Sequence, residues 1–415
     1  MSTTVVSSLF WITVTAVLAP LLAGLIRKRR IPEVVLLLVG GIIIGPHALD
    51  IASEGTEIQL LRELGLGMLF LLAGYEIKTS ELVGREGRRA LYTWICCLAL
   101  AFAVTFAIGA TGLVSAESAV AIAMCSTALG TLLPILRDAG MLEGRLGLTV
   151  LNHGAFGELG PVIAMAILLS ARGSLKSAIV LVVFAVAAVV VWLISEHLVA
   201  RHHWLTRVVS AGSDTTAQTT VRITVMLLVG LMALAYAFDL DTILGAFAAG
   251  FILRRMLPDG DESFEIKLDG IAFGLLIPVF FVTSGMAIDI SAVAAEPGVL
   301  VVFVLMILLV RGVPVFIAAR WDRGNSGNQQ PFDLRERVQL GLYAATGLPI
   351  IVAVTGVAVA SGDMSAGNAS VLVTAGAVTV LVMPLAASIV GARGKKSVAP
   401  SRDPQGEPGR EGDLL

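Results

Sequence analysis

Apolar stretches long enough to cross a membrane recur along nearly the whole of this 415-residue chain. A helix needs about 20 apolar residues to cross the hydrocarbon core of a bilayer. Runs such as AIVLVVFAVAAVVVWLI (178–194) are apolar on every helical face, whereas a transmembrane barrel would show short segments of alternating hydrophobicity. The composition agrees, with 56% hydrophobic and only 14% charged residues. The sequence therefore predicts an all-α protein that crosses a membrane many times.

The hydropathy of the chain predicts about thirteen spans. In chain order they are 4–26, 32–45, 62–77, 90–113, 117–136, 146–170, 177–199, 221–239, 242–256, 268–288, 298–319, 338–360 and 370–392. If alternate connections are cytoplasmic, starting after the first span, 25 of the 29 Lys and Arg residues lie on that side. The exceptions are Arg62, Arg172 and Lys176, which lie on the other side, and Arg311, which lies in the membrane. Because cytoplasmic loops carry the excess of Lys and Arg, the N-terminus is expected outside and the C-terminus in the cytoplasm.

The domain organisation is expected to be simple. Residues 1–393 form one predicted transmembrane domain, and residues 394–415 are polar and rich in Pro, Gly, Arg and Glu. Such a composition cannot bury a core, so we expect a disordered cytoplasmic tail. The connections between spans are too short for a nucleotide-sensing domain. No dinucleotide fingerprint, zinc spacing or catalytic triad pattern is found, so we expect no cofactor, no enzyme activity and no nucleic-acid partner.

Two spans carry the composition of a broken helix. CSTALG (125–130) in the fifth span and ATGLP (345–349) in the twelfth each place hydroxyl, glycine and nearby proline residues inside an apolar run. Unwound backbone at membrane depth is tolerated only where it lines a cavity or is buried in protein. If spans 1–6 and 8–13 are two repeats, they have opposite orientations, which predicts inverted six-helix repeats with crossed discontinuous helices, as in secondary transporters. Ordinary Gly and Pro kinks are the alternative.

Glu158 lies near the middle of the sixth span. An ionised carboxylate at that depth costs about 3 kcal/mol or more unless it is compensated, so it is expected to face the bundle interior and mark an ion or proton path. A monovalent cation prefers oxygen ligands. The carboxylate and the hydroxyls of Ser126 and Thr127 can supply them. The alternative is that Glu158 only holds helices together as a member of a buried ion pair.

Arg311 lies near the middle of the eleventh span. It can act as an electrostatic partner of Glu158, or it can donate to carbonyls of the broken helices, and both roles stay open. Asn152 can offer its amide oxygen to the site or form a helix–helix hydrogen bond, and His153 can relay protons or be a satisfied buried histidine. The expected surroundings of the site are Asn152, His153, Gly157 and Thr346.

Four segments together resemble a known family. They are LGMLFLLAGYEIKTSEL (66–82), MCSTALGTLLPILRDAGMLEGRLG (124–147), LGAFAAGFIL (244–253) and IPVFFVTSGMAIDI (277–290). In this order they resemble the monovalent cation:proton antiporters of the second type, which include Kef-like and NapA-like sodium or potassium exchangers. The resemblance implies a core domain that moves against a dimerisation domain, homodimers, and antiport of Na⁺ or K⁺ against H⁺ that serves pH homeostasis.

The resemblance also implies roles for individual residues. The ion-binding carboxylate of the family falls on Glu158, its basic residue on Arg311, and the hydroxyl of its first broken helix on Thr127, so that Glu158 and Thr127 would hold the transported cation. Where the family usually has Asn-Asp, Asp-Asp or Gln-Asp, this chain has Gly157-Glu158. That difference implies electroneutral, one-for-one exchange.

Two other functions stay open. The same fold could export an organic or antibiotic-like substrate in exchange for protons, which the altered Gly157-Glu158 pair favours, or it could form a gated cation channel. The absence of a repeated filter-like segment argues against the channel. The expected location is a bacterial plasma membrane.

Overall fold

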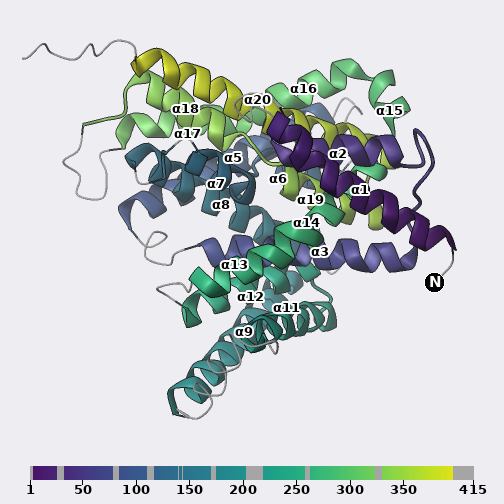
Figure 1. The fold of residues 1–415 in the computed structure, drawn as a ribbon. Coiled ribbons are helices and arrows are strands. Elements are labelled where there is room, and N and C mark those ends of the chain that lie inside the picture. Colours follow the sequence, from purple (N-terminus) through teal and green to yellow (C-terminus); the bar gives the residue numbers. More distant parts are fainter. Residues whose placement is uncertain are drawn as a thin grey trace, which may run out of the picture.

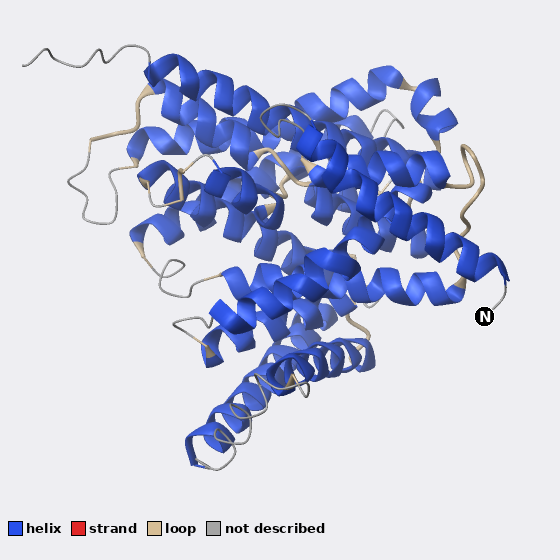
Figure 2. Cartoon of the chain, in the orientation of Figure 1, coloured by secondary structure: helices blue, strands red, loops and turns tan. Residues whose placement is uncertain are grey.

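The structure, a computed structural model, describes most of the chain. The described residues are 3–25, 32–77, 84–109, 116–138, 140–142, 144–169, 174–201, 218–257, 262–322 and 330–395. Within them, all regular secondary structure is helical (Figure 2), which confirms the predicted all-α class. Among the described residues, ten helical segments are long and apolar enough to cross a membrane, and two shorter apolar helices accompany them. The exact number of spans and their inverted repetition stay predictions, and residues 396–415 of the expected tail lie outside the described residues.

The helices follow one another along the chain as labelled in Figure 1. The first half contains α1 (Thr3–Leu25), α2 (Glu33–Ile44), α3 (Thr56–Glu76), α5 (Arg85–Gly109), α6 (Glu117–Met124), α7 (Leu129–Asp138), α8 (Arg145–Leu168) and α9 (Ser174–Arg201). The second half contains α11 (Thr219–Ala237), α12 (Thr242–Met256), α13 (Glu262–Ile271), α14 (Ile277–Met286), α15 (Ile290–Ala295), α16 (Pro297–Ile307), α17 (Val313–Ala318), α18 (Leu334–Ala344), α19 (Leu348–Ala360) and α20 (Ala366–Lys395). Two π-helical turns, Ala272–Leu276 and Leu308–Gly312, join α13 to α14 and α16 to α17, and a 3₁₀ turn follows α17 at Ala319–Trp321.

Several helix starts follow from local side-chain chemistry. Asp333 accepts from the backbone N–H of Glu336, whose side chain accepts from the N–H of Asp333, and this capping box starts α18. Asp241 accepts from the N–H of Ile243 at the start of α12. Such caps satisfy backbone donors that have no partner inside the helix, and this fixes where the polar connections end.

Both predicted helix breaks are present. The first separates α6 from α7 after Met124, and the second separates α18 from α19 after Ala344. The two unwound segments meet, because the N–H of Ala128 donates to the carbonyl of Thr346 at 2.5 Å. Discontinuous helices therefore cross at their breaks, as the sequence predicts. Backbone groups of one break that have no partner in their own helix are partly satisfied by the other break.

The contacts between helices fall into two groups. In the first, α3 packs closely on α12 and α2 on α14, and α1 and α11 join them. At these contacts glycines such as Gly74 and Gly250 lie against the backbone of the facing helix, since small residues let transmembrane helices approach closely. In the second group, α5, α6, α8, α17, α18, α19 and α20 pack around the crossed breaks. A division into a moving core and a dimerisation domain stays a prediction.

Candidate functional site

Glu158 lies in the interior of the second group of helices. It is on α8, its side chain is 2% exposed, and one carboxylate oxygen, Oε2, has no hydrogen-bond partner. The backbone N–H of Leu129, the first residue of α7, donates to the carboxylate. Glu158 therefore faces the start of a half-helix, where free N–H groups and the helix dipole interact favourably with an anion. An oxygen with no partner in this interior is available to bind a proton or a cation.

The hydroxyls of the first break hold the two breaks together. The Oγ1 of Thr127 donates to the carbonyl of Ala344 at 2.6 Å, and the Oγ of Ser126 contacts the carbonyl of Gly347 at 3.2 Å. The N–H of Thr127 also donates to the carbonyl of Gly157 at 2.8 Å. The first break is thereby fixed both to the second break and to the turn of α8 that carries Glu158.

Arg311 is fully buried and donates to three groups around the breaks. Its Nε donates to Oγ1 of Thr127 at 2.9 Å, its Nη2 to the carbonyl of His153 at 2.6 Å, and its Nη1 to Sγ of Cys97 at 3.7 Å. Within the described part of the chain, Arg311 forms no ion pair with Glu158. Of the two roles that the sequence left open, donation to the broken-helix region is the one that this conformation contains.

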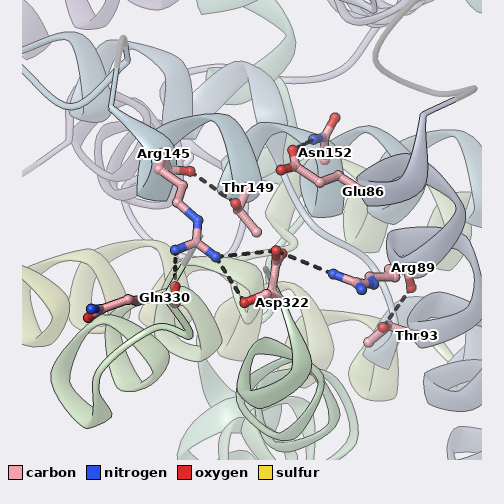
Figure 3. Close-up of polar contacts among 8 residues, drawn as sticks. All are labelled: Glu86, Arg89, Thr93, Arg145, Thr149, Asn152, Asp322 and Gln330. Atoms are coloured by element: carbon pink, nitrogen blue, oxygen red, sulfur yellow. Dashed lines mark hydrogen bonds and ion pairs between the residues drawn. The ribbon is translucent and has the colours of Figure 1, made fainter. Parts of the chain in front are cut away.

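The other predicted residues lie at different distances from this centre. Asn152 donates from Nδ2 to Oε2 of Glu86 at 3.2 Å, which is a hydrogen bond between α8 and α5 (Figure 3). His153 takes part through its carbonyl, while Nδ1 of its buried ring has no hydrogen-bond partner. Thr346 donates to the carbonyl of Tyr343 at 2.8 Å and lies in the second break. The structure thus brings Gly157, His153 and Thr346 to the site and turns the amide of Asn152 towards α5.

A second polar cluster lies at one end of the same helices (Figure 3). Asp322, 5% exposed, is 3.5 Å from Arg89 on α5 and 3.4 Å from Arg145 on α8. Arg145 also donates to the backbone carbonyls of Asp322 at 2.9 Å and Gln330 at 2.5 Å, and it lies 4.0 Å above the ring of Phe332. Both ends of the connection between α17 and α18 are therefore attached to the helix that carries Glu158.

Sequence reasoning missed one acidic residue near the site. Glu76 is the last residue of α3, and its carboxylate is close enough to Glu158 for the two to interact electrostatically. α3 packs against α7, so Glu76 comes from the first group of helices and Glu158 from the second. An acidic residue at the end of an apolar run is the only sequence signal for it, and that signal is equally typical of a span end.

Comparisons with known proteins agree with this architecture. The family model described as "Sodium/hydrogen exchanger, transmembrane" matches residues 13–392. The chain is 27% identical over 368 residues to the putative Na⁺/H⁺ antiporter YjbQ of Bacillus subtilis, which covers 83% of this chain and 58% of that protein. It is 25% identical over 323 residues to the probable Na⁺/H⁺ antiporter GerT of Bacillus cereus, which covers 74% of this chain and 81% of the relative.

One solved structure shares the fold over almost its whole length. It is the sodium proton antiporter MjNhaP1 from Methanocaldococcus jannaschii, with a TM-score of 0.59 and 16% sequence identity, covering 94% of this chain and 98% of that one. The resemblance found in the four sequence segments is confirmed by the family match. The chain belongs to the sodium/hydrogen exchanger family.

Proposed function

We propose that this chain is a secondary transporter that exchanges a monovalent cation, Na⁺ or K⁺, for H⁺ by alternating access. The observation that carries the proposal is the buried Glu158 carboxylate, which has an oxygen without a partner and faces the start of α7. The antiporter names of the relatives support the same function. The transported cation and proton are cargo, and both bind at Glu158, with Thr127 and Ser126 as neighbouring oxygens.

The proposed coupling arises because one carboxylate has two mutually exclusive partners. With a proton or a monovalent cation bound, Glu158 is neutral and can be carried through the barrier. When Glu158 is empty and ionised, its burial costs about 3 kcal/mol or more. The loaded states therefore cross and the empty state does not, so that each cation that leaves is exchanged for one proton.

The contacts of Arg311 support tight coupling. An arginine that formed an ion pair with empty Glu158 would neutralise it and allow an unloaded crossing. Here the guanidinium is occupied by Thr127, Cys97 and the carbonyl of His153. The positive charge stays with the helix breaks, and the empty carboxylate keeps its cost of burial.

The position of Gly157 supports electroneutral exchange. The residue before Glu158 has no ionisable group, so α8 offers one carboxylate to the cargo at this level. Glu76 adds a second negative charge from the other group of helices, and this charge attracts a cation towards the site without travelling with it. These two placements support the proposed stoichiometry of one cation for one proton.

The proposed setting is a bacterial plasma membrane, with the N-terminus outside, the C-terminus in the cytoplasm, and a homodimer as the working assembly. The asymmetric distribution of Lys and Arg supports the orientation. A homodimer is what the family resemblance implies.

The proposal is tested with purified protein in proteoliposomes that contain a pH-sensitive dye. Sodium, potassium, lithium and organic cations are added in turn, and the recovery of dye fluorescence is compared for the wild type, Glu158→Ala and Arg311→Ala. We expect sodium or potassium to release the quenched dye in the wild type and not in Glu158→Ala. A response to organic substrates alone would identify the exporter alternative and overturn cation exchange.

A further inference from the structure

Gly157 lies where α8 contacts the first helix break. A Cβ atom built on this glycine would lie 2.5 Å from Cβ and 2.5 Å from Oγ1 of Thr127, and 2.6 Å from Nη2 of Arg311. Contacts this short do not occur between real side chains. Even alanine at position 157 would therefore move the guanidinium, the threonine or α8 itself.

The missing side chain also exposes a backbone acceptor. Helical side chains lean towards the N-terminus and cover the preceding turn, so a side chain at 157 would cover the carbonyl of His153. That carbonyl has two lone pairs, of which the helix uses one. The other accepts from Nη2 of Arg311 at 2.6 Å. Without a side chain in the way, a guanidinium can approach the middle of α8 from the side.

The same contact connects three elements. Arg311 comes from the π-helical turn Leu308–Gly312, which lies just before Pro314. It reaches the break through Oγ1 of Thr127 and α8 through the carbonyl of His153. The carbonyl of Gly157 itself accepts from the N–H of Thr127 at 2.8 Å. Any shift at Gly157, which lies one residue before Glu158 on α8, is therefore transmitted to the break.

We propose that Gly157 is a positioning residue: its missing side chain forms the space in which Arg311 binds α8 and the first break, and this arrangement sets the geometry of the cation site. The unusual Gly157-Glu158 pair is then the complement of Arg311. Position 157 must lack a side chain as long as residue 311 is an arginine bound in this way. This inference rests on the proposed function only for its transport readout.

The test compares Gly157→Ala with Gly356→Ala in purified, detergent-solubilised and reconstituted protein. Gly356 is the matched control, since it lies on α19 and a Cβ there would meet no atom within 4 Å. We expect Gly157→Ala to lower the melting temperature, raise the KM for the cation and reduce turnover by about tenfold or more. Gly356→Ala is expected to leave all three unchanged. A substitution that only reduced the amount of folded protein would lower the maximal rate and leave the KM unchanged.

A double-variant cycle identifies Arg311 as the group that Gly157 positions. In an Arg311→Ala background, Gly157→Ala is expected to lower the melting temperature by clearly less than it does in the wild type, because the guanidinium contacts are already lost. Equal effects in the two backgrounds would overturn the inference, and so would wild-type stability and KM in Gly157→Ala. The melting data need no transport, so the inference can be judged separately even if the proposed cation exchange fails.

Discussion

At the residue scale, Glu158 and Arg311 are oppositely charged, are both buried near the helix breaks, and have different contacts. The guanidinium of Arg311 donates to three neutral groups, while Glu158 keeps a carboxylate oxygen without a partner. The contacts of Arg311 hold neighbouring elements together, whereas a buried carboxylate oxygen without a partner is available to bind a proton or a cation. Glu158 is therefore the residue that binds cargo in this account, and Arg311 holds the backbone on which the cargo site is built.

Replacement of Arg311 by lysine tests this distinction. Arg311→Lys keeps the positive charge, but a single ammonium cannot reproduce the fork that reaches Thr127 and His153 together. We expect the variant to lose about 1–3 kcal/mol of stability, seen as a lower melting temperature, and to transport more slowly. The same change at the exposed Arg85 serves as the control. Wild-type stability and turnover in Arg311→Lys would show that charge alone is what matters at this position.

At the element scale, the sequence predicts the positions of the two helix breaks. It does not predict which residues from other helices pack around them. Hydroxyl, glycine and proline residues weaken a helix locally, so CSTALG and ATGLP indicate the two breaks by composition alone. The approach of Glu76 to Glu158 depends on how α3 packs against α7. The π-helical turn around Arg311 similarly depends on tertiary contacts, although Pro314 marks the place where a regular α-helix is disturbed. The sequence alone gives no reason for a glycine at position 157, because Arg311, the residue whose guanidinium lies against it, comes from another part of the chain.

The cluster around Asp322 connects elements that carry the site, which leads to a further prediction. Arg145→Ala removes an ion pair, two hydrogen bonds to backbone carbonyls and a cation–π contact. It also leaves the buried carboxylate of Asp322 with fewer partners. We expect a loss of about 2 kcal/mol of stability, measured as a lower melting temperature. Arg335→Ala, at an exposed position of α18, is the control. Equal melting temperatures for the two variants would show that the cluster does not hold the connection from α17 to α18.

At the scale of the whole molecule, the candidate site has contributions from both helix groups. α8 and the first break supply Glu158 and Thr127, and α3 supplies Glu76. The hydropathy pattern predicts the class and the approximate span positions because a bilayer requires long apolar helices. Which spans pack together depends on which helix faces carry small or polar residues. A single sequence does not determine which of these faces meet.

The predicted orientation can be tested by chemical labelling of intact cells. Asp363, in the connection from α19 to α20, is expected outside, and Arg335, at the start of α18, is expected in the cytoplasm. Asp363→Cys should therefore react with a membrane-impermeant maleimide added to the medium, and Arg335→Cys should react only after the cells are opened. The wild type is the control for its own three cysteines. Reaction of Arg335→Cys in intact cells, and of Asp363→Cys only in opened cells, would show that the orientation is the opposite of the predicted one.

Tracer flux tests whether one carboxylate carries cation and proton in turn. Proteoliposomes that contain wild type or Glu158→Gln are given an imposed pH gradient, and uptake of labelled sodium or potassium is measured together with the internal pH. Glutamine keeps the size of the side chain and removes its ability to bind a proton or a cation as an ionised group. We predict cation uptake with matching proton release in the wild type and neither flux in Glu158→Gln. Proton-coupled cation uptake that persists in Glu158→Gln would contradict the account.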